Sequence, residues 1–500
     1  MTRTAIIFVP YVSMLSIPPL APALLKSCLD QSQTHSLVFD FNLAFQKNLD
    51  QDTRIEILSW ITVPGYQMDT KVFARYQEFV DFCTNQILCF NPDVSAISVF
   101  SHESQRFTED LCFNLKKAQP LMHVIIGGSG VSVHQFALSM PWGQMMLNSG
   151  MTDCVLEGEG ERIFPDLVQN RTMGWVSVPQ IDSEHLSDLP VPNFDDYDFD
   201  LYGPIDTLKL PITASKGCVR SCKFCDVASI WPRFRYRRGQ NVADEMIGIY
   251  QRYRISNFAF TDSLINGGLK PFREMNQVLA ETLPTTLSYS GQFICRDQRS
   301  MPPSDFSLMK LGGCSSVSIG IESGSESVRN HMDKQFSDKD LDYTVEQLLI
   351  HGIEQRWNIM VGYPTETDND WKKTLHLIKK YSVHKNLIKI IPVGVFQLLQ
   401  NTPITKNEML ESLEIDYHQQ DGFNEYNWSS GTNPTNNLKR RAERWFELID
   451  MITDLEMLTP NHRIHQKNMV LKKQLEFYES SDRSIFPIRQ QSFQDPTHIN

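Results

Sequence analysis

The sequence predicts an α/β protein in which two successive series of parallel strands and helices precede a small, mainly helical C-terminal region. Short apolar, strand-like runs alternate with helical segments over residues 5–168 and again over residues 209–396. This alternation is typical of parallel sheets covered by helices. Residues 181–206, between the two series, are rich in Asp and Pro. Such a composition is typical of a linker laid over the surface.

The composition narrows the class of protein. The chain has 500 residues, enough for two or three domains, and a formal net charge of -12. An acidic chain is a poor partner for nucleic acid or an anionic membrane, because both attract basic surfaces. No apolar run approaches the roughly 20 residues needed to span a bilayer. The start, MTRTAIIFVPYVSM, is better interpreted as a first strand than as a signal peptide. We therefore expect a cytoplasmic protein.

The first series predicts a doubly wound, Rossmann-like domain over residues 1–180. Strands are expected at 5–9, 36–41, 94–100 and 123–130, helices at 19–30, 70–90 and 104–118, and a strand, an acidic turn and a helix within 153–168. Ligands of such sheets bind at the carboxyl ends of the strands. Those ends carry Pro10, Asn42, Ser101, Gly127, Gly128 and the acidic stretch 157–161, which includes Glu159.

The second series predicts a partial (βα)6 barrel over residues 207–405, with its active site at the carboxyl ends of the strands. Six strands are expected in the segments 210–215, 257–263, 286–294, 315–323, 355–364 and 387–396, with helices at 241–253, 303–311, 337–350 and 367–381. Asn241 is a plausible N-cap. Residues 406–500 form the C-terminal region, with a loop at 424–437 and an amphipathic helix at 438–458. We expect this region to cap the barrel and shape the substrate pocket.

Three of the ten cysteines, Cys218, Cys222 and Cys225, are spaced Cys-x3-Cys-x2-Cys. The other seven are scattered singly and are expected to be buried small hydrophobic residues. Three adjacent thiols without a metal would be prone to oxidation. A structural zinc site normally has four protein ligands, and this segment has no fourth Cys and no His. The pattern therefore indicates a metal centre with one open position, which is typical of a chemical site.

This pattern, with Phe224 before the last cysteine, resembles the signature of the radical S-adenosylmethionine (radical SAM) enzymes. The resemblance covers about residues 205–405, because further motifs follow in the family's order: FTDSLING (260–267), SIGIESGSESVRN (318–330), IMVGYPTET (359–367) and VFQLLQNTPI (395–404).

The resemblance implies that the three cysteines bind a [4Fe-4S] cluster whose open iron binds S-adenosylmethionine (SAM). An electron donor such as flavodoxin or ferredoxin would reduce the cluster, and SAM would be cleaved to a 5′-deoxyadenosyl radical. Phe224 would lie near the adenine, or simply pack inward. Glu322, followed by Ser323, would bind the ribose, or be a buried structural carboxylate. The implied adenine pocket includes Gly362 and Pro364, and the implied contacts to the methionine end or the substrate are Asp262, Ser263 and Asn266, with Asp262 and Asn266 as catalytic candidates.

The first series resembles the cobalamin-binding domain of one class of radical SAM enzymes. The segments that carry the resemblance are VPYVSMLSIPPLAPALL (9–25), GGSGVS (127–132) and EGEGERIFPDLV (157–168). The Asp-x-His-x-x-Gly motif of many cobalamin domains is missing, and Asn42 stands where its His is expected. His102 either approaches the cobalt or is a surface residue.

These resemblances imply a cobalamin-dependent methylation of an unactivated carbon in a small molecule or peptide. The alternative is a radical rearrangement or cyclisation, with cobalamin assisting or absent. A non-catalytic metal-binding adaptor is disfavoured, because the motif at 318–330 would then have no purpose. The arginine-rich stretch RFRYRRG (233–239) is either a solvated loop closing over the barrel or a contact to substrate or phosphate.

Overall fold

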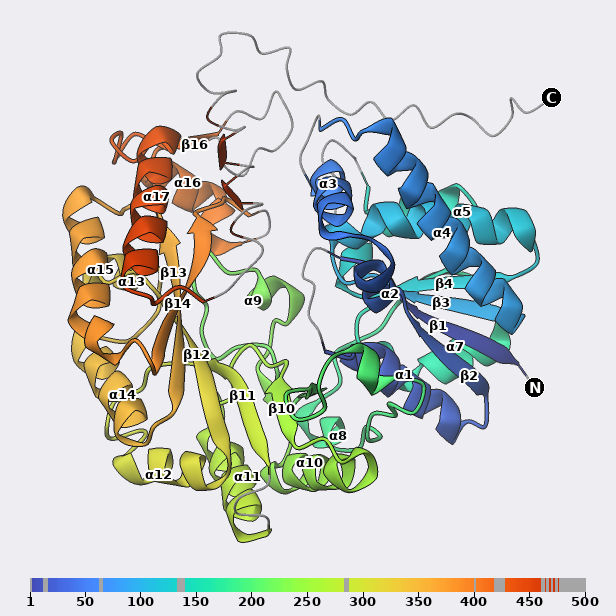
Figure 1. Ribbon diagram of the computed structural model, residues 1–500, viewed down its shortest axis with the longest axis horizontal. Helices are drawn as coiled ribbons and strands as arrows, with labels where there is room; N and C mark the ends of the chain where they lie inside the picture. Colours follow the sequence, from blue (N-terminus) through green and yellow to red (C-terminus); the bar gives the residue numbers. More distant parts are fainter. Residues whose placement is uncertain are drawn as a thin grey trace.

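Two α/β units lie side by side in the structure, a computed structural model (Figure 1). It describes residues 2–11, 17–62, 66–132, 140–282, 287–399, 402–417 and 428–459, together with residues 464, 467, 468, 471, 472 and 475. Both units are built on parallel sheets of six strands, which confirms the predicted fold class.

The first unit is a doubly wound sheet with the strand order β2-β1-β3-β4-β5-β6. Its strands are β1 (Arg3–Phe8), β2 (His35–Asp40), β3 (Val94–Ser98), β4 (His123–Gly127), β5 (Cys154–Glu157) and β6 (Gly174–Ser177). Its helices are α1 (Leu20–Gln31), α2 (Phe41–Asn48), α3 (Gln51–Thr62), α4 (Thr70–Phe90), α5 (Gln105–Ala118), α6 (Trp142–Asn148) and α7 (Phe164–Asn170).

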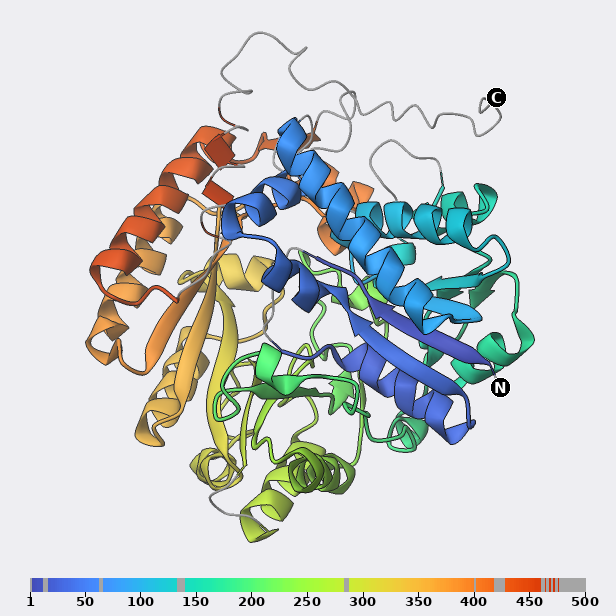
Figure 2. The same ribbon diagram turned by 45° about the vertical axis from the view of Figure 1, so that its right-hand side comes forward.

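Helices cover both faces of this sheet, because the strands bury side chains on both sides. Ile6 of β1 packs in one apolar cluster with Ala23 of α1, whereas its neighbour Ile7 packs in another with Phe79 of α4. Figure 2 shows α4 lying across one face of the sheet. The strand order reverses between β1 and β3, and ligands of open α/β sheets bind beside the carboxyl ends of strands at such a switch point.

The second unit is a partial barrel with the strand order β14-β13-β12-β11-β10-β7. Its strands are β7 (Lys209–Ile212), β10 (Asn257–Phe260), β11 (Ser288–Phe293), β12 (Cys314–Glu322), β13 (Glu354–Val361) and β14 (Ile388–Val395). The connecting helices are α10 (Gly239–Tyr253), α11 (Leu269–Thr282), α12 (Pro303–Leu311), α13 (Glu326–His331), α14 (Asp338–Ile350) and α15 (Asp368–Tyr381). Within the described residues, β7 and β14 form no hydrogen-bonded strand pair, so the barrel is open between them.

A short antiparallel hairpin follows β7. Its strands are β8 (Ser215–Lys216) and β9 (Arg235–Tyr236), and residues 217–234 between them, here called the cysteine loop, contain the short helix α9 (Val227–Ile230). Helix α10 begins at Gly239, so the expectation of an N-cap at Asn241 is wrong. The side chain of Glu274 instead accepts a hydrogen bond from the N–H of Gly239, at 2.9 Å.

The segment 181–206, expected as a surface linker, buries several of its aromatic side chains. It contains α8 (Ser183–Leu186) and a 3-10 turn, η4 (Phe199–Leu201). Phe194 is fully buried and packs edge-to-face against Tyr253 of α10. Tyr202 is buried and donates a hydrogen bond to Asp40 at the end of β2. Buried aromatic side chains thus attach this segment to both units, although its Asp- and Pro-rich composition predicts a surface linker.

The C-terminal region consists of α16 (Asn407–Ser412), an antiparallel pair β15 (Ile415–Tyr417) and β16 (Trp428–Ser430), and α17 (Leu438–Asp454). The expected loop at 424–437 therefore contains a strand at its described residues 428–430. Helix α17 packs against β13 and β14. No helix among the described residues is long and apolar enough to cross a membrane.

Arg441 and Arg444 fasten α17 to the barrel. Both are fully buried. Arg444 forms a 3.0 Å ion pair with Glu366, which follows β13, and the Arg441 guanidinium lies 3.8 Å from the centre of the Trp428 ring. Gly362 has a φ of 81°, and a Cβ there would lie 2.4 Å from Cγ of Arg441. Glycine at 362 is therefore required for α17 to dock.

We predict that Gly362→Ala lowers the free energy of unfolding by about 1–3 kcal/mol, because the added methyl collides with Arg441 and the left-handed backbone disfavours a side chain. Gly248→Ala is the matched control. Gly248 lies within α10, where a Cβ would meet nothing within 4 Å, and Ala there is expected to stabilise the helix by about 0.5–1 kcal/mol. Denaturant unfolding of both variants checks this, and equal effects would contradict the docking role of Gly362.

Candidate active site

The cysteine loop is held against the top of the barrel by two neighbouring segments. The N–H of Lys223 donates to the carbonyl of Met332 at 3.0 Å, and the carbonyl of Lys223 accepts from the N–H of Ile404 at 2.8 Å. Arg220 donates to the side chain of Gln335 at 2.5 Å. The loop therefore takes its shape from the segment after β12 and from the turn at 402–405.

The three cysteines of this loop are partly exposed free thiols. Burial raises the pKa of all three, that of Cys225 to about 11, and neighbouring cysteines raise the pKa values of Cys222 and Cys225 further. The three thiols lie within residues 218–225 of the cysteine loop. Among the described residues, no three Cys, His, Asp or Glu side chains are grouped to hold a single metal ion. A [4Fe-4S] cluster spreads its ligands, since each thiolate binds a different iron, so this donor set fits a cluster.

The end of β12 and the segment after it store backbone strain beside the cysteines. Glu322, Asp333 and Gln335 have φ angles of 67°, 61° and 53°, in the left-handed region that residues other than glycine rarely adopt. Such strained positions cluster at functional sites. Asp333 accepts a hydrogen bond from Ser221 at 3.1 Å, so this strained segment contacts the cysteine loop directly.

Glu322 and Lys334 form an ion pair beneath the cysteine loop. Their closest atoms are 3.2 Å apart, and each side chain is about 10% exposed. Lys334 Nζ also lies 5.6 Å from the centre of the Phe224 ring. Burial lowers the pKa of Lys334, but Glu322 and Cys222 outweigh it, so the pKa is raised and the lysine is charged. Lys334 could not be identified from the sequence, because it stands 12 residues after Glu322 in no recognised spacing.

Phe224 packs inward, as one of its two interpretations predicts. It is partly buried against the apolar cluster that contains Met332, Tyr363 and Phe396. Its contact with an adenine ring stays a prediction.

Residues 212–378 match the Radical SAM superfamily. These residues are a radical SAM domain. The match begins at the end of β7 and ends within α15, so it includes the cysteine loop and the Glu322–Lys334 pair.

Solved structures share the fold of both units. The radical SAM methyltransferase TsrM from Kitasatospora setae, with cobalamin and a [4Fe-4S] cluster bound, aligns with a TM-score of 0.61 and 14% identity over 85% of this chain and 82% of its own. The cobalamin-dependent radical SAM enzyme OxsB, with aqua-cobalamin and SAM bound, aligns with a TM-score of 0.65 and 14% identity over 96% of this chain and 71% of its own. The doubly wound unit before the radical SAM domain is thus part of the shared fold.

Curated relatives match over shorter stretches. An uncharacterized methyltransferase of Pyrococcus horikoshii is 22% identical over 46% of this chain, and the bacteriochlorophyllide d C-12(1)-methyltransferase of Chlorobaculum tepidum is 26% identical over 34%. The anaerobic magnesium-protoporphyrin IX monomethyl ester cyclase of Rubrivivax gelatinosus is 20% identical over 61%. The chain spans 53%, 37% and 59% of the lengths of these three proteins, respectively.

At the carboxyl edge of the first sheet, the buried hydroxyl groups of two serines have no hydrogen-bond partner among the described residues. Among the described residues, nothing hydrogen-bonds the side chains of Ser101 and Ser104, which follow β3 at the switch point. A buried polar group without a partner is costly, so these hydroxyls fit a polar ligand at this edge. His102 is exposed, which agrees with the surface interpretation.

Other predicted residues of this edge have structural roles. Asn42 is buried, and its Oδ1 lies 3.4 Å from the N–H of Tyr11. Gly128 has a φ of 106°, and a Cβ there would lie 2.5 Å from the carbonyl oxygen of Val99. A Cβ at the preceding residue, Gly127, would lie 3.2 Å from the carbonyl oxygen of Leu156. The two glycines thus let neighbouring strand ends approach closely, and a cobalamin contact for any of the three stays a prediction.

The acidic turn and the arginine-rich stretch are joined by the ion pair between Glu159 and Arg235. The Glu159 carboxylate, predicted as a cofactor contact, is buried and bound by Arg235 at 2.6 and 2.8 Å. Arg237 forms a buried 2.6 Å ion pair with Glu245 of α10. A solvated loop is therefore wrong for Arg235 and Arg237, although Arg233 and Arg238 are exposed. Composition alone does not distinguish the buried Arg235 and Arg237 from the exposed Arg233 and Arg238. Their burial depends on the folded positions of Glu159, 76 residues before Arg235, and Glu245, 8 residues after Arg237.

The catalytic candidates Asp262 and Asn266 are both bound by their own chain. The Asp262 carboxylate accepts hydrogen bonds from Ser215 at 2.5 Å and from the N–H of Ala214 at 3.0 Å. The Asn266 amide donates to the carbonyl of Ile294 at 2.9 Å and accepts from its N–H at 3.0 Å. Ser263 is partly exposed. Asp262 thus supports the base of the cysteine-loop hairpin, and Asn266 fixes the end of β11.

Ser323, Gly362 and Pro364 lie among contacts to α15 and to the C-terminal region. Ser323 is fully buried, with its hydroxyl 3.4 Å from that of Thr374 in α15. The carbonyl of Pro364 accepts a hydrogen bond from Asn433 at 2.9 Å. Contacts of these residues with SAM stay predictions.

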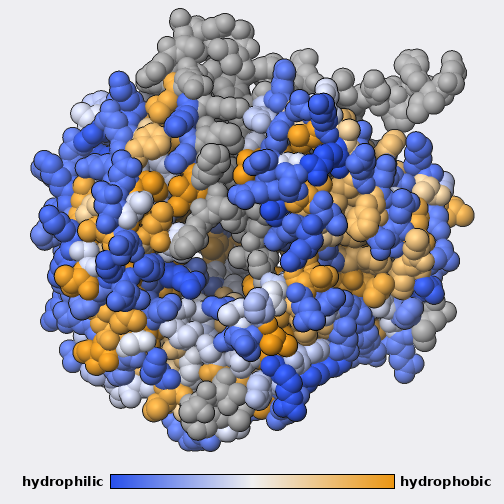
Figure 3. All heavy atoms as spheres, viewed as in Figure 1, coloured by the Kyte–Doolittle hydropathy of each residue, from blue (hydrophilic) through white to orange (hydrophobic). Residues whose placement is uncertain are grey.

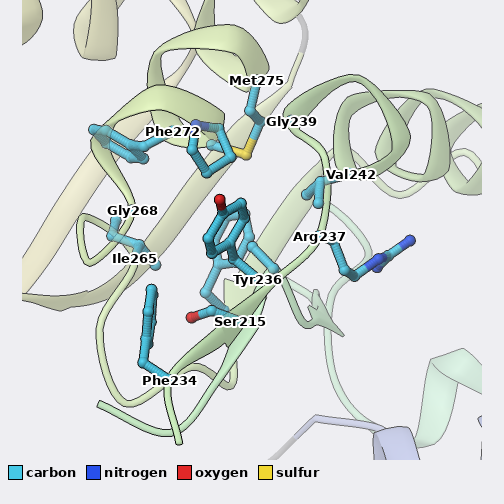
Figure 4. A pocket seen from close by; sticks show the side chains of 13 residues that line it. Ser215, Phe234, Tyr236, Arg237, Gly239, Val242, Ile265, Gly268, Phe272 and Met275 are labelled. Carbon is cyan, nitrogen blue, oxygen red and sulfur yellow. The ribbon is translucent and has the colours of Figure 1, made fainter. Parts of the chain in front are cut away.

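A cavity of about 20 Å³ lies behind the hairpin, lined by Phe234, Tyr236, Phe272 and Met275 among others (Figure 4). This volume holds little more than one water molecule. The cavity is therefore a packing gap of the radical SAM domain and is too small for a cofactor or substrate.

We predict that Asp262→Asn removes a pH-dependent loss of stability. Burial raises the pKa of Asp262 from 3.8 to about 7. Between these values the unfolded chain is ionised and the folded one is protonated, so the free energy of unfolding falls as the pH rises. Asn mimics the protonated acid, so the variant should gain about 1–3 kcal/mol over the wild type between pH 5 and pH 8. Calorimetry at both pH values checks this; a constant difference would contradict the raised pKa.

Proposed function

We propose that the protein is a radical SAM enzyme that methylates an unactivated carbon with the help of cobalamin. The observation that carries the proposal is the set of three thiols, fixed in one loop at the mouth of a radical SAM domain, with no fourth cysteine in the loop. Three protein ligands leave one iron of a [4Fe-4S] cluster open for SAM. When bound and reduced, the cluster supplies the electron that cleaves SAM to methionine and a 5′-deoxyadenosyl radical.

Residues around the cysteine loop would bind and orient SAM. Glu322 ends β12, and its carboxylate can accept hydrogen bonds from the ribose hydroxyls. Lys334 carries a buried positive charge beside Cys222, so it can attract the carboxylate of the methionine end. The two side chains now neutralise each other at 3.2 Å. SAM would therefore exchange this ion pair for contacts of its own, and Phe224 would cover the adenine.

Cobalamin would bind at the carboxyl edge of the first sheet. The hydroxyls of Ser101 and Ser104, which have no partner within the described ranges, support this site, as do the TsrM and OxsB structures, which hold cobalamin. Because Asn42 replaces the expected His and contacts Tyr11, we propose that no side chain from this position binds the cobalt.

A cyclisation is the second candidate function. The observation that favours it is the alignment over 61% of this chain with an anaerobic cyclase. In both cases we propose a small-molecule or peptide substrate and a flavodoxin or ferredoxin as electron donor. A cytoplasmic location follows from this chemistry, because the cysteines must stay reduced.

We predict that Cys222→Ala abolishes both cluster binding and SAM cleavage. After anaerobic reconstitution, the variant should lack the iron content of the wild type and form no 5′-deoxyadenosine. Cys89→Ala is the matched control, because Cys89 is an exposed free cysteine of α4, and it should match the wild type in both measurements. SAM cleavage that survives in Cys222→Ala would overturn the radical SAM assignment.

Mass spectrometry of the product separates the two candidate functions. With SAM labelled in its methyl group and a panel of candidate substrates, methylation adds one labelled methyl group in place of hydrogen. Cyclisation changes the product mass without adding the label. If the only product is cyclised and carries no label, the methylation proposal is wrong and cyclisation is the function.

A further inference from the structure

The acidic turn Glu157–Glu161 at the end of β5 packs tightly on the first unit and presents Glu159 to the radical SAM domain. Gly158 has a φ of 101°, and a Cβ there would lie 2.4 Å from the carbonyl oxygen of Val178. A Cβ at Gly160 would lie 2.4 Å from the Leu156 side chain. Both glycines let the turn fold tightly onto its own unit. Glu159, between them, contacts the hairpin of the radical SAM domain.

Glu159 and Arg235 form a buried ion pair between the two units. Two nitrogens of Arg235 donate to the two carboxylate oxygens of Glu159 at 2.6 and 2.8 Å. The side chains are 1% and 4% exposed. Ile181 completes the contact, since its N–H donates to Glu159 at 2.6 Å and its carbonyl accepts from Arg235 at 2.5 Å. The first unit, the segment after it and the hairpin thus meet at one point.

The other strand of the hairpin is attached to the same turn. Lys216 of β8 lies 2.7 Å from Glu161 and 3.6 Å from Glu159. Trp231 of the cysteine loop covers both cations, with Lys216 Nζ at 5.4 Å and the Arg235 guanidinium at 5.6 Å from its ring centre. Lys216 and Arg235 stand directly before and after the cysteine loop. The acidic turn therefore holds both ends of the loop that carries the three thiols.

We propose that Glu159 and Arg235 are positioning residues that fix the cysteine loop relative to the ligand-binding edge of the first unit. A bidentate pair between a guanidinium and a carboxylate has a fixed geometry, unlike an apolar contact. The turn follows β5, so it belongs to the carboxyl edge at which Ser101 and Ser104 lie. The ion pair thus sets the separation between that edge and the three thiols. Its consequence for methyl transfer rests on the proposed function.

Amide hydrogen exchange of the apoprotein tests the contact without any cofactor. Arg235→Gln should speed exchange in residues 157–163, across the interface, about tenfold or more, because an opened contact exposes their amides. Arg235→Lys keeps the positive charge but cannot form the bidentate hydrogen bonds to the carboxylate. It should therefore speed exchange at 157–163 less than Arg235→Gln does. Glu245→Gln is the matched control, since it breaks the Arg237–Glu245 pair, which is also buried but lies within the radical SAM domain. Unchanged exchange at 157–163 in Arg235→Gln, or the same change in the control, would overturn the proposal.

A second measurement tests the consequence in reconstituted protein. Formation of 5′-deoxyadenosine needs only the radical SAM domain. Formation of S-adenosylhomocysteine needs the methyl group of SAM to pass to the electron pair of added cob(I)alamin, and therefore needs both units. We expect Glu159→Gln and Arg235→Gln to keep the first reaction and lose the second by about tenfold to hundredfold.

If both reactions fall to the same extent, or if neither falls, the positioning role is overturned. Glu245→Gln should leave the ratio of the two products unchanged. A wild-type protein that forms neither product would refute the proposed function instead, while hydrogen exchange would still decide the role of the ion pair.

Discussion

The cysteine loop must be held in shape by its neighbours, because it has little regular structure of its own. Two attachments hold the loop in shape, and a third sets its position relative to the first unit. The strained segment after β12 and the turn at 402–405 hold the residues around Cys222. The Glu159–Arg235 pair holds the end of the loop against the first unit. In Figure 1, α9 of this loop lies between the two units, and Figure 3 shows that the surface between them is hollowed on this face.

Charge is distributed around this loop in a way that suits a bound cofactor. Lys334 and Glu322 lie beneath it as a buried pair, and breaking a buried pair is costly unless new partners replace the lost ones. SAM offers an amino group, a carboxylate and ribose hydroxyls, so it can supply those partners. In the first unit, the hydroxyls of Ser101 and Ser104 form no hydrogen bond with the part of the chain that the structure describes. We propose that SAM uses the side chains of Glu322 and Lys334 and that a ligand of the first unit uses the hydroxyls of Ser101 and Ser104.

Most of the fold could be predicted from the sequence, because periodicity and apolar runs are local signals. The helices at 70–90 and 303–311 agree with α4 and α12 at both ends. The errors concern residues whose roles depend on distant partners. Asn241 does not cap α10, because Glu274 from α11 binds the helix start. Phe194 and Tyr202 lie in an acidic segment that looks solvated, yet they are buried by contacts with both units.

The same reasoning explains what could be predicted of the site. The cysteines were found because the metal needs closely spaced ligands in one loop. The role of Glu159 was missed because Arg235 lies 76 residues further along the chain, and Lys334 was missed because only the folded loop brings it to Phe224. We propose that three thiolates leave one iron of the cluster open to SAM. Electron–nuclear double resonance of the reduced, reconstituted protein tests it with SAM labelled with nitrogen-15 in its amino group and oxygen-17 in its carboxylate. Hyperfine coupling from both labels to the cluster is predicted, and a reduced cluster that shows no coupling to either label would contradict the account.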